Sequence, residues 1–85
     1  MTARRAIRMH QKDNVATTVE EVKSGDSVQI SPGGENQTLK AIEDIPFGFK
    51  IAIEEIPQGM LIIKYGDTIG KAGRLIAQGA LVHDP

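Results

Sequence analysis

The sequence predicts an all-β protein of short strands and tight turns, with at most one short helix. Two observations support this. A short apolar unit that ends in glycine recurs along the chain, and the stretches between the units are rich in β-branched residues. The unit has an apolar residue six positions before the glycine and another three before it. It occurs at residues 19–25, 42–48 and 53–59, and in a weaker form at residues 73–79.

The composition limits the class of protein. The 85 residues are 40% apolar and include no cysteine and no tryptophan, so we expect one domain, residues 1–85, with an aliphatic core. Ten Lys and Arg stand against eleven Asp and Glu, which disfavours a nucleic-acid partner. No apolar run approaches the roughly 20 residues of a membrane span, and no secretory signal is evident. With the absence of cysteine, these features predict a cytoplasmic protein without a membrane partner.

The N-terminal half of the chain contains three predicted elements. A basic edge, residues 1–8, is expected to be solvated or to face a partner. Residues 15–22 could form a strand, or a short helix that Asp13 or Asn14 would cap. We favour the strand, because β-branched residues are stiff at χ1 and the stretch matches the later units. Residues 31–38 are then expected to form a polar loop, since proline and two glycines lie within them.

The later elements follow from the turn signals. Two of the units place proline two positions before the glycine. Proline cannot donate to a strand ladder and glycine adopts positive φ, so each unit predicts a chain reversal. Residues 50–53 and 61–65 are the strands expected between reversals. Residues 65–70 predict another hairpin, with Gly66 and Asp67 at its turn.

Four segments carry a resemblance to a known family. They are M-H-Q-K-D-N-V-A (9–16), D-I-P-F-G-F-K-I-A-I (44–53), I-K-Y-G-D-T-I-G (63–70) and V-H (82–83). Over residues 10–83 the chain resembles the SAF domain of altronate and galactarate dehydratases, which is related to the small subunit of sulfolactate sulfo-lyase. The resemblance implies an SAF-like β-clip fold, in which a long, bent hairpin is wrapped on itself.

The resemblance also implies a function. The chain would be the small subunit of a sugar-acid dehydratase, a hydro-lyase that removes water from a hydroxy acid such as altronate or galactarate. A large dehydratase subunit would carry most of a metal-dependent active site, with iron, manganese or magnesium as the divalent metal, so the isolated chain is expected to be inactive. Two alternatives stay open: a non-catalytic SAF-like module for binding or assembly, and the small subunit of a sulfo-lyase. Assembly of this chain into a homo-oligomer also stays open.

The candidate catalytic residues are the histidines. Elimination of water needs a base for the proton next to the carboxylate, and an acid or metal for the leaving hydroxyl. Histidine suits base catalysis and metal ligation. His10 and His83 are the two histidines of the chain, so we expect both to be catalytic and to bind metal, which requires the fold to bring them together. In the alternative interpretation His10 ends a strand, and Asp13 and Asn14 form an ordinary turn that satisfies its own backbone.

Further residues are expected to bind substrate, namely Asp13, Asn14, Lys50, Lys64 and Tyr65. Asp13 would orient His10 or share a metal with it. A lysine beside a carboxylate substrate can supply a charge-assisted hydrogen bond, although most strand lysines project into solvent. Phe49 and Leu81 stand where the family has histidine, which favours the non-catalytic alternative.

Two pairs of adjacent glutamates, Glu20 with Glu21 and Glu54 with Glu55, do not predict a paired-carboxylate site. Adjacent residues of a strand point to opposite faces, so the members of a pair cannot converge on one substrate. We expect them to lie at exposed strand ends.

Overall fold

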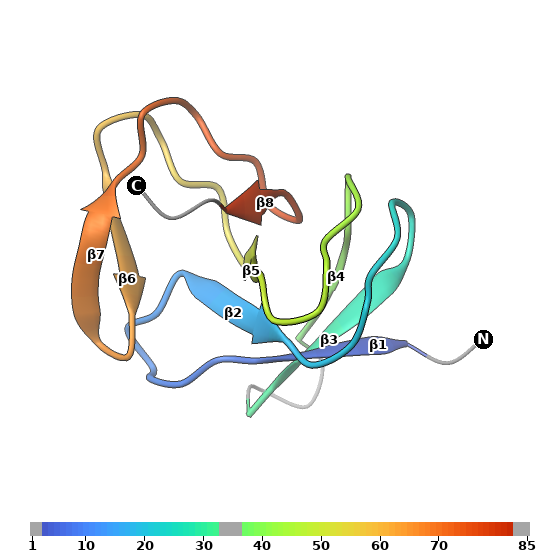
Figure 1. The fold of residues 1–85 in the computed structure, drawn as a ribbon. Helices are drawn as coiled ribbons and strands as arrows, with labels where there is room; N and C mark the ends of the chain where they lie inside the picture. The colour runs from blue at the N-terminus through green and yellow to red at the C-terminus, as the bar shows by residue number, and fades with distance from the viewer. Residues whose placement is uncertain (1–2, 33–36, 83–85) are drawn as a thin grey trace.

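Within residues 3–32 and 37–82, which the computed structural model describes, every regular element is a strand, so the all-β prediction is confirmed (Figure 1). In chain order the strands are β1 (Arg4–Ile7), β2 (Val15–Thr18), β3 (Ser27–Ser31), β4 (Thr38–Lys40), β5 (Lys50–Ala52), β6 (Leu61–Lys64), β7 (Asp67–Lys71) and β8 (Leu81–Val82). They form a six-stranded sheet of order β4-β3-β1-β2-β5-β8 and a separate β6–β7 hairpin. Only the β1–β3 pair is parallel among these described strands. This curled sheet of short strands agrees with an SAF-like β-clip. The described part of the chain contains no helix long and apolar enough to cross a membrane.

The four sequence units fold with the same backbone trace. Their central residues form two isolated antiparallel bridges, Val22 with Ile45 and Ile56 with Ile76. Each bridge has two backbone hydrogen bonds of 2.8 to 2.9 Å. Three positions after each central residue stands a glycine with φ between 85° and 93°, a conformation in which a side chain is strained. The predicted reversals are therefore confirmed, and the weak fourth copy, residues 73–79, folds like the others.

The four units divide the chain into two equivalent halves. In each half one unit leads into an antiparallel hairpin, β3–β4 or β6–β7, and the hairpin leads into the second unit. Each unit's glycine N–H donates to the carbonyl of the residue that precedes the other unit of its half. These acceptors are small, buried residues, namely Thr18, Ala41, Ala52 and Ala72. The chain thus repeats one unit–hairpin–unit motif in tandem.

The buried apolar residues form two hydrophobic clusters, and each cluster includes residues of one hairpin. The larger cluster includes Val28, Ile30 and Leu39 from the β3–β4 hairpin, and the smaller includes Ile62 from β6 and Val82 from β8. Alternation along the first hairpin is strict, since β3 exposes every second residue. The core is aliphatic, as the composition predicts.

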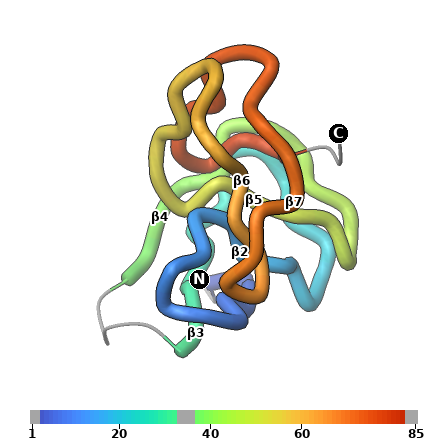
Figure 2. The backbone as a smooth tube through the Cα atoms, turned by 90° about the vertical axis from the view of Figure 1, so that its left-hand side faces the viewer, coloured from blue at the N-terminus to red at the C-terminus, as the bar shows by residue number. Residues whose placement is uncertain are grey.

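The N-terminal segment, residues 4–14, lies outside the repeat and contacts both halves. Its β1 strand runs parallel to β3 of the first hairpin, with Arg4 opposite Val28. Its end pairs with β6 of the second hairpin, where the Asn14 N–H donates to the Ile63 carbonyl. Figures 1 and 2 show this segment, in blue, reaching the β6–β7 hairpin. It therefore ties the two halves together.

Three boundaries refine the sequence predictions. The strand in residues 15–22 is β2, which ends at Thr18, and the helical alternative is wrong. In the polar loop 31–38, residues 33–36 lie outside the described part of the chain. The turn of the β6–β7 hairpin falls one residue earlier than predicted, because Lys64 pairs with Asp67 and leaves Tyr65 and Gly66 at the tip.

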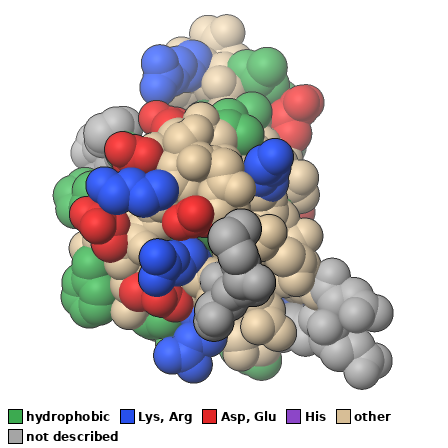
Figure 3. All heavy atoms as spheres, turned by 90° about the vertical axis from the view of Figure 1, so that its right-hand side faces the viewer, with side chains coloured by type: hydrophobic (Ala, Val, Ile, Leu, Met, Phe, Trp, Pro, Cys, Tyr) green, Lys and Arg blue, Asp and Glu red, His purple; other side chains and the backbone are tan. Residues whose placement is uncertain are grey.

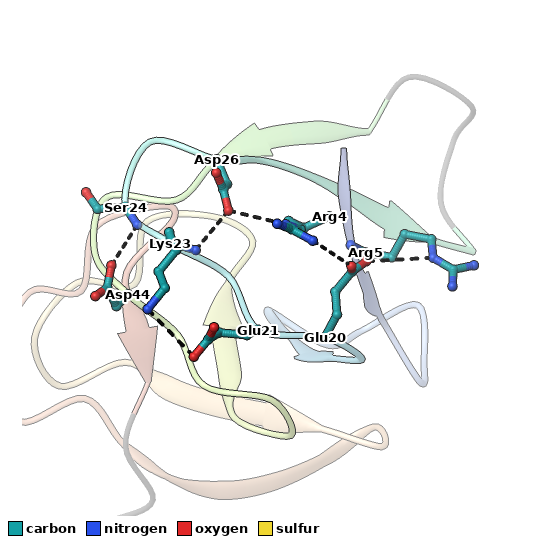
Figure 4. A network of polar contacts seen from close by, with 8 residues as sticks. All are labelled: Arg4, Arg5, Glu20, Glu21, Lys23, Ser24, Asp26 and Asp44. Atoms are coloured by element: carbon teal, nitrogen blue, oxygen red, sulfur yellow. Dashed lines mark hydrogen bonds and ion pairs between the residues drawn. The ribbon is translucent and has the colours of Figure 1, made fainter. Parts of the chain in front are cut away.

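Acidic side chains of the first unit and its turn pair with Arg4 and Arg5 of the basic N-terminal edge (Figure 4). The Arg4 guanidinium lies 3.2 Å from Glu20 and 3.5 Å from Asp26, and the Arg5 guanidinium lies 4.0 Å from Glu20. The hydrogen bond with Glu20 raises the pKa of the Arg4 guanidinium. Glu21 instead lies 3.6 Å from Lys23, so the two adjacent glutamates diverge as expected. The face opposite the β6–β7 hairpin accordingly carries interspersed charges of both signs (Figure 3).

Candidate functional site

Most of the predicted site residues lie together at the tip of the β6–β7 hairpin. Hydrogen bonds and ring contacts there connect His10, Asp13, Asn14, Lys64 and Tyr65. Lys50 instead lies in β5 of the larger sheet, 7% exposed and paired with Thr17 and Val82. His83 lies outside the described residues.

The Asp13 carboxylate fastens the N-terminal segment to the hairpin tip. Its Oδ2 accepts hydrogen bonds from the backbone N–H groups of His10, at 3.1 Å, and Tyr65, at 3.0 Å, while Oδ1 accepts from the Gly66 N–H at 2.7 Å. The Asp13 N–H donates to the His10 carbonyl at 2.9 Å. Only 3% of Asp13 is exposed. A carboxylate that accepts three charge-assisted bonds within the protein is a structural clamp.

The clamp acts on a strained turn. Tyr65 and Gly66 have φ values of 58° and 77°, which makes this a type I′ turn, a geometry that favours asparagine followed by glycine. A tyrosine in the left-handed region costs about 1–2 kcal/mol. Because the Asp13 carboxylate binds the N–H groups of both tip residues, it offsets this strain.

Asn14 acts as a strand partner for β6. Its Nδ2 donates to the Leu61 carbonyl and its Oδ1 accepts from the Ile63 N–H, both at 2.9 Å. Its backbone adds bonds to the Ile63 carbonyl at 3.2 Å and from the Ile53 N–H at 3.0 Å. The amide thus satisfies the backbone of a strand that follows it by nearly 50 residues. The interpretation of Asp13 and Asn14 as a purely local turn is incomplete for this reason.

His10 lies exposed against the hairpin tip. Its Nδ1 accepts a hydrogen bond of 3.1 Å from the Lys12 N–H. Its ring packs on Gly66, where a Cβ atom would stand 3.0 Å from the ring Cγ and Cδ2 atoms. A glycine is therefore required at position 66 both by φ and by the imidazole.

Lys64 and Tyr65 lie at the same hairpin tip that the His10 ring contacts through Gly66. The Lys64 Nζ atom lies 5.1 Å from the centroid of the Tyr65 ring, within the range of a cation–π contact. Tyr65 is 59% exposed. We call His10, Lys64 and Tyr65 the hairpin patch. It presents an imidazole, an ammonium group and a phenol, which are groups that can form hydrogen bonds with a carboxylate or a hydroxyl.

The described residues do not fit a metal site formed by this chain alone. No group of three or more His, Asp and Glu side chains suited to a metal ion occurs in residues 3–32 and 37–82. The Asp13 oxygens already accept three N–H groups, and the Lys12 N–H occupies the lone pair of His10 Nδ1. Metal binding by His10 and His83 stays a prediction that would need ligands from outside these residues.

The hairpin patch lies at the surface, where His10 and Tyr65 are exposed. Two hollows in the described surface, of about 210 and 230 Å³, are lined by other residues, including Leu75 and Leu81 in the first and Arg5 and Ser31 in the second. Neither of these two hollows is lined by a residue of the patch.

Comparison with known proteins gives the chain its relatives. Residues 4–85 match the model of the family described as the altronate/galactarate dehydratase SAF domain. The chain is 38% identical over 77 residues to an altronate dehydratase of Escherichia coli K12, and 39% identical over 80 residues to the galactarate dehydratase (L-threo-forming) of the same strain. It is 30% identical over 77 residues to an altronate dehydratase of Bacillus subtilis 168. These alignments cover 91%, 92% and 91% of this chain but 15%, 14% and 15% of the relatives. The chain therefore spans only a small part of the length of these enzymes.

Proposed function

This chain belongs to the altronate/galactarate dehydratase SAF domain family, and we propose that it is the small subunit of a sugar-acid dehydratase that acts with a large dehydratase polypeptide. One observation carries the proposal. The hairpin patch exposes an imidazole, an ammonium group and a phenol on a buried carboxylate clamp. The proposed reaction removes water from a hydroxy acid of the altronate or galactarate type, in the carbohydrate metabolism of the cytoplasm.

Each residue of the patch has a proposed role. Lys64 donates a charge-assisted hydrogen bond to the substrate carboxylate. Tyr65 contacts the sugar-acid hydroxyls through its phenol. His10 is proposed to contact the substrate through its imidazole, and His83 is proposed as a second catalytic imidazole. Asp13 and Asn14 are proposed to position the hairpin patch without contacting the substrate, because their side-chain polar atoms form hydrogen bonds with the protein backbone.

The large polypeptide supplies what this chain lacks. We place the divalent metal, whether iron, manganese or magnesium, on that polypeptide, because the residues described here do not form a metal site by themselves. The base that removes the substrate proton belongs there as well. Lys50, buried in β5, is proposed to face the partner or the substrate from the larger sheet.

The direct experiment combines this chain with the large dehydratase polypeptide of the same genome and measures dehydration of altronate and of galactarate. We expect activity only when both polypeptides are present. His10→Ala should lower kcat/KM by about 100-fold or more. Lys40→Ala is the matched control, since Lys40 is an exposed residue of β4 outside the patch, and it should leave activity unchanged. A reconstituted mixture that dehydrates neither acid would refute the proposal.

A non-catalytic module is the second candidate function. Phe49 is 46% exposed and Leu81 is half-buried, and these apolar side chains stand where the family has histidine. A module of this kind would bind the large polypeptide without changing its rate, so titration of this chain into the dehydratase assay separates the two functions. The same assay with sulfolactate tests the sulfo-lyase alternative.

A further inference from the structure

We infer that His10 works as a hydrogen-bond donor through its Nε2–H group, and that Asp13 and Gly66 are positioning residues that hold the ring in this state. The inference rests on the proposed function and gives it a defined role for the imidazole. It replaces a metal-ligand or general-base role of His10 with a donor role toward the anionic form of the substrate.

The hydrogen bond at Nδ1 determines which ring nitrogen carries the proton. The Lys12 backbone N–H lies 3.1 Å from His10 Nδ1, and a backbone N–H can only donate. Nδ1 must therefore be the acceptor, and the neutral imidazole carries its proton on Nε2. If Nε2 acted as a base or bound a metal, it would need a free lone pair, and the proton of the neutral ring would then lie on Nδ1. A proton on Nδ1 would face the Lys12 N–H, so both groups would be donors.

The ring is also fixed in position. The Asp13 carboxylate accepts the His10 N–H, and the Asp13 N–H donates to the His10 carbonyl. The same carboxylate accepts hydrogen bonds from the N–H groups of Tyr65 and Gly66, and the ring packs on Gly66. One buried carboxylate therefore positions both the histidine backbone and the turn under its ring.

A fixed neutral donor suits one step of the elimination. The Cα–H bond of the hydroxy acid breaks and its proton passes to a base of the large polypeptide. The electron pair forms the Cα–Cβ double bond as the Cβ–O bond breaks, and the leaving hydroxyl departs as water after taking a proton from an acid of that polypeptide. Negative charge grows on the carboxylate oxygens as the Cα–H bond breaks, and a donor aimed at them stabilises that charge. His10 keeps its own proton throughout, and Lys64 adds a positive charge at the same hairpin tip.

The tautomer can be measured on the 85-residue chain without the partner. We propose long-range ¹H–¹⁵N correlation spectra of the chain carrying His83→Gln, so that His10 is the only histidine. The expected spectrum shows the proton on Nε2 when the ring is neutral. Gly66→Ala should displace the ring and reduce this preference to that of a histidine without the Lys12 hydrogen bond. Gly59→Ala should leave it intact, because Gly59 has a similar φ of 86° but its Cβ would meet nothing within 4 Å.

Two substitutions test the donor role in the reconstituted enzyme. The His10→Gln variant keeps an N–H donor near the position of Nε2 but cannot act as a base, whereas His10→Ala removes the donor. We expect kcat of His10→Gln to stay within about tenfold of the unmodified enzyme and kcat of His10→Ala to fall by about 100-fold or more. A His10→Gln variant as slow as His10→Ala, or a proton found on Nδ1, would overturn the donor role in an active enzyme. A mixture without dehydratase activity refutes the proposed function instead, and the spectra distinguish these cases.

Discussion

Replacing Asp13 by asparagine tests the clamp on which the hairpin patch depends. The carboxylate accepts three backbone N–H bonds and is 3% exposed. Asparagine offers one oxygen, and its NH₂ group is itself a donor. At least one N–H group therefore faces a donor, at a cost of about 1–3 kcal/mol, and the other two bonds weaken from charge-assisted to neutral, by about 1 kcal/mol each. We expect the free energy of unfolding to fall by about 4 kcal/mol, a large share of the roughly 5–10 kcal/mol expected for a small domain.

Urea unfolding followed by far-ultraviolet circular dichroism measures this loss. Asp67→Asn is the matched control, because it makes the same chemical change at an exposed residue at the start of β7. It should change the free energy of unfolding by less than about 0.5 kcal/mol. If the free energy of unfolding of Asp13→Asn lies within about 1 kcal/mol of that of the unmodified chain, the three hydrogen bonds do not stabilise the fold as proposed, and Asp13 is not a structural clamp.

Three further predictions have defined outcomes. Gly79→Ala should destabilise the chain by more than about 3 kcal/mol, because its Cβ would collide with the Lys40 carbonyl oxygen in addition to the strain at φ 88°. Gly48→Ala, whose Cβ would meet nothing within 4 Å, should lose only about 1–2 kcal/mol in the same urea titration, and equal losses for the two variants would contradict the predicted collision. Tyr65→Asn should raise the midpoint temperature of unfolding, because it relieves the strain of a tyrosine at positive φ, which is worth about 1 kcal/mol. The same substitution should raise KM in the dehydratase assay, and an unchanged KM would remove Tyr65 from the substrate site. Thr18→Ala should lower the free energy of unfolding in urea by about 1 kcal/mol, because the Thr18 hydroxyl donates to a carbonyl of the second unit at 2.9 Å. The equivalent positions of the other units hold alanine, so a loss above about 3 kcal/mol would mean that these positions differ in packing.

The sequence predicted the turns well because their causes are local. The freedom to adopt positive φ is a property of glycine itself, so a glycine at a fixed distance after a β-branched residue indicates a reversal without knowledge of the partner. The weak unit 73–79 kept the central Ile76 and the glycine, and these two residues were sufficient for the same trace. The pairing of the units, Val22 with Ile45 and Ile56 with Ile76, was not predictable from one unit. It depends on which hairpin lies between them.

The roles of Asp13 and Asn14 illustrate what the sequence could not supply. Their residue types indicated a turn, and the bond from the Asp13 N–H to the His10 carbonyl is that turn. Their side chains, however, bind backbone groups about 50 positions later, and no local pattern encodes that distance. One signal was present in the sequence. Tyr65 precedes Gly66 at a two-residue hairpin tip where asparagine is favoured, which indicates that something outside the hairpin stabilises the turn.

The internal repeat explains where a site can form in so small a chain. The two unit–hairpin–unit motifs are held by equivalent backbone bonds, so most of their polar groups are used in holding the fold. The N-terminal segment stands outside the repeat, and it meets the two hairpins differently: it joins the first as the parallel strand β1, and it meets the second through Asp13 and Asn14. At the edge of the first hairpin, the backbone groups of β3 pair with those of β1. Side-chain pairing at the second hairpin instead leaves His10, Lys64 and Tyr65 at the hairpin tip, which is why the candidate chemistry collects where the N-terminal segment meets the second hairpin.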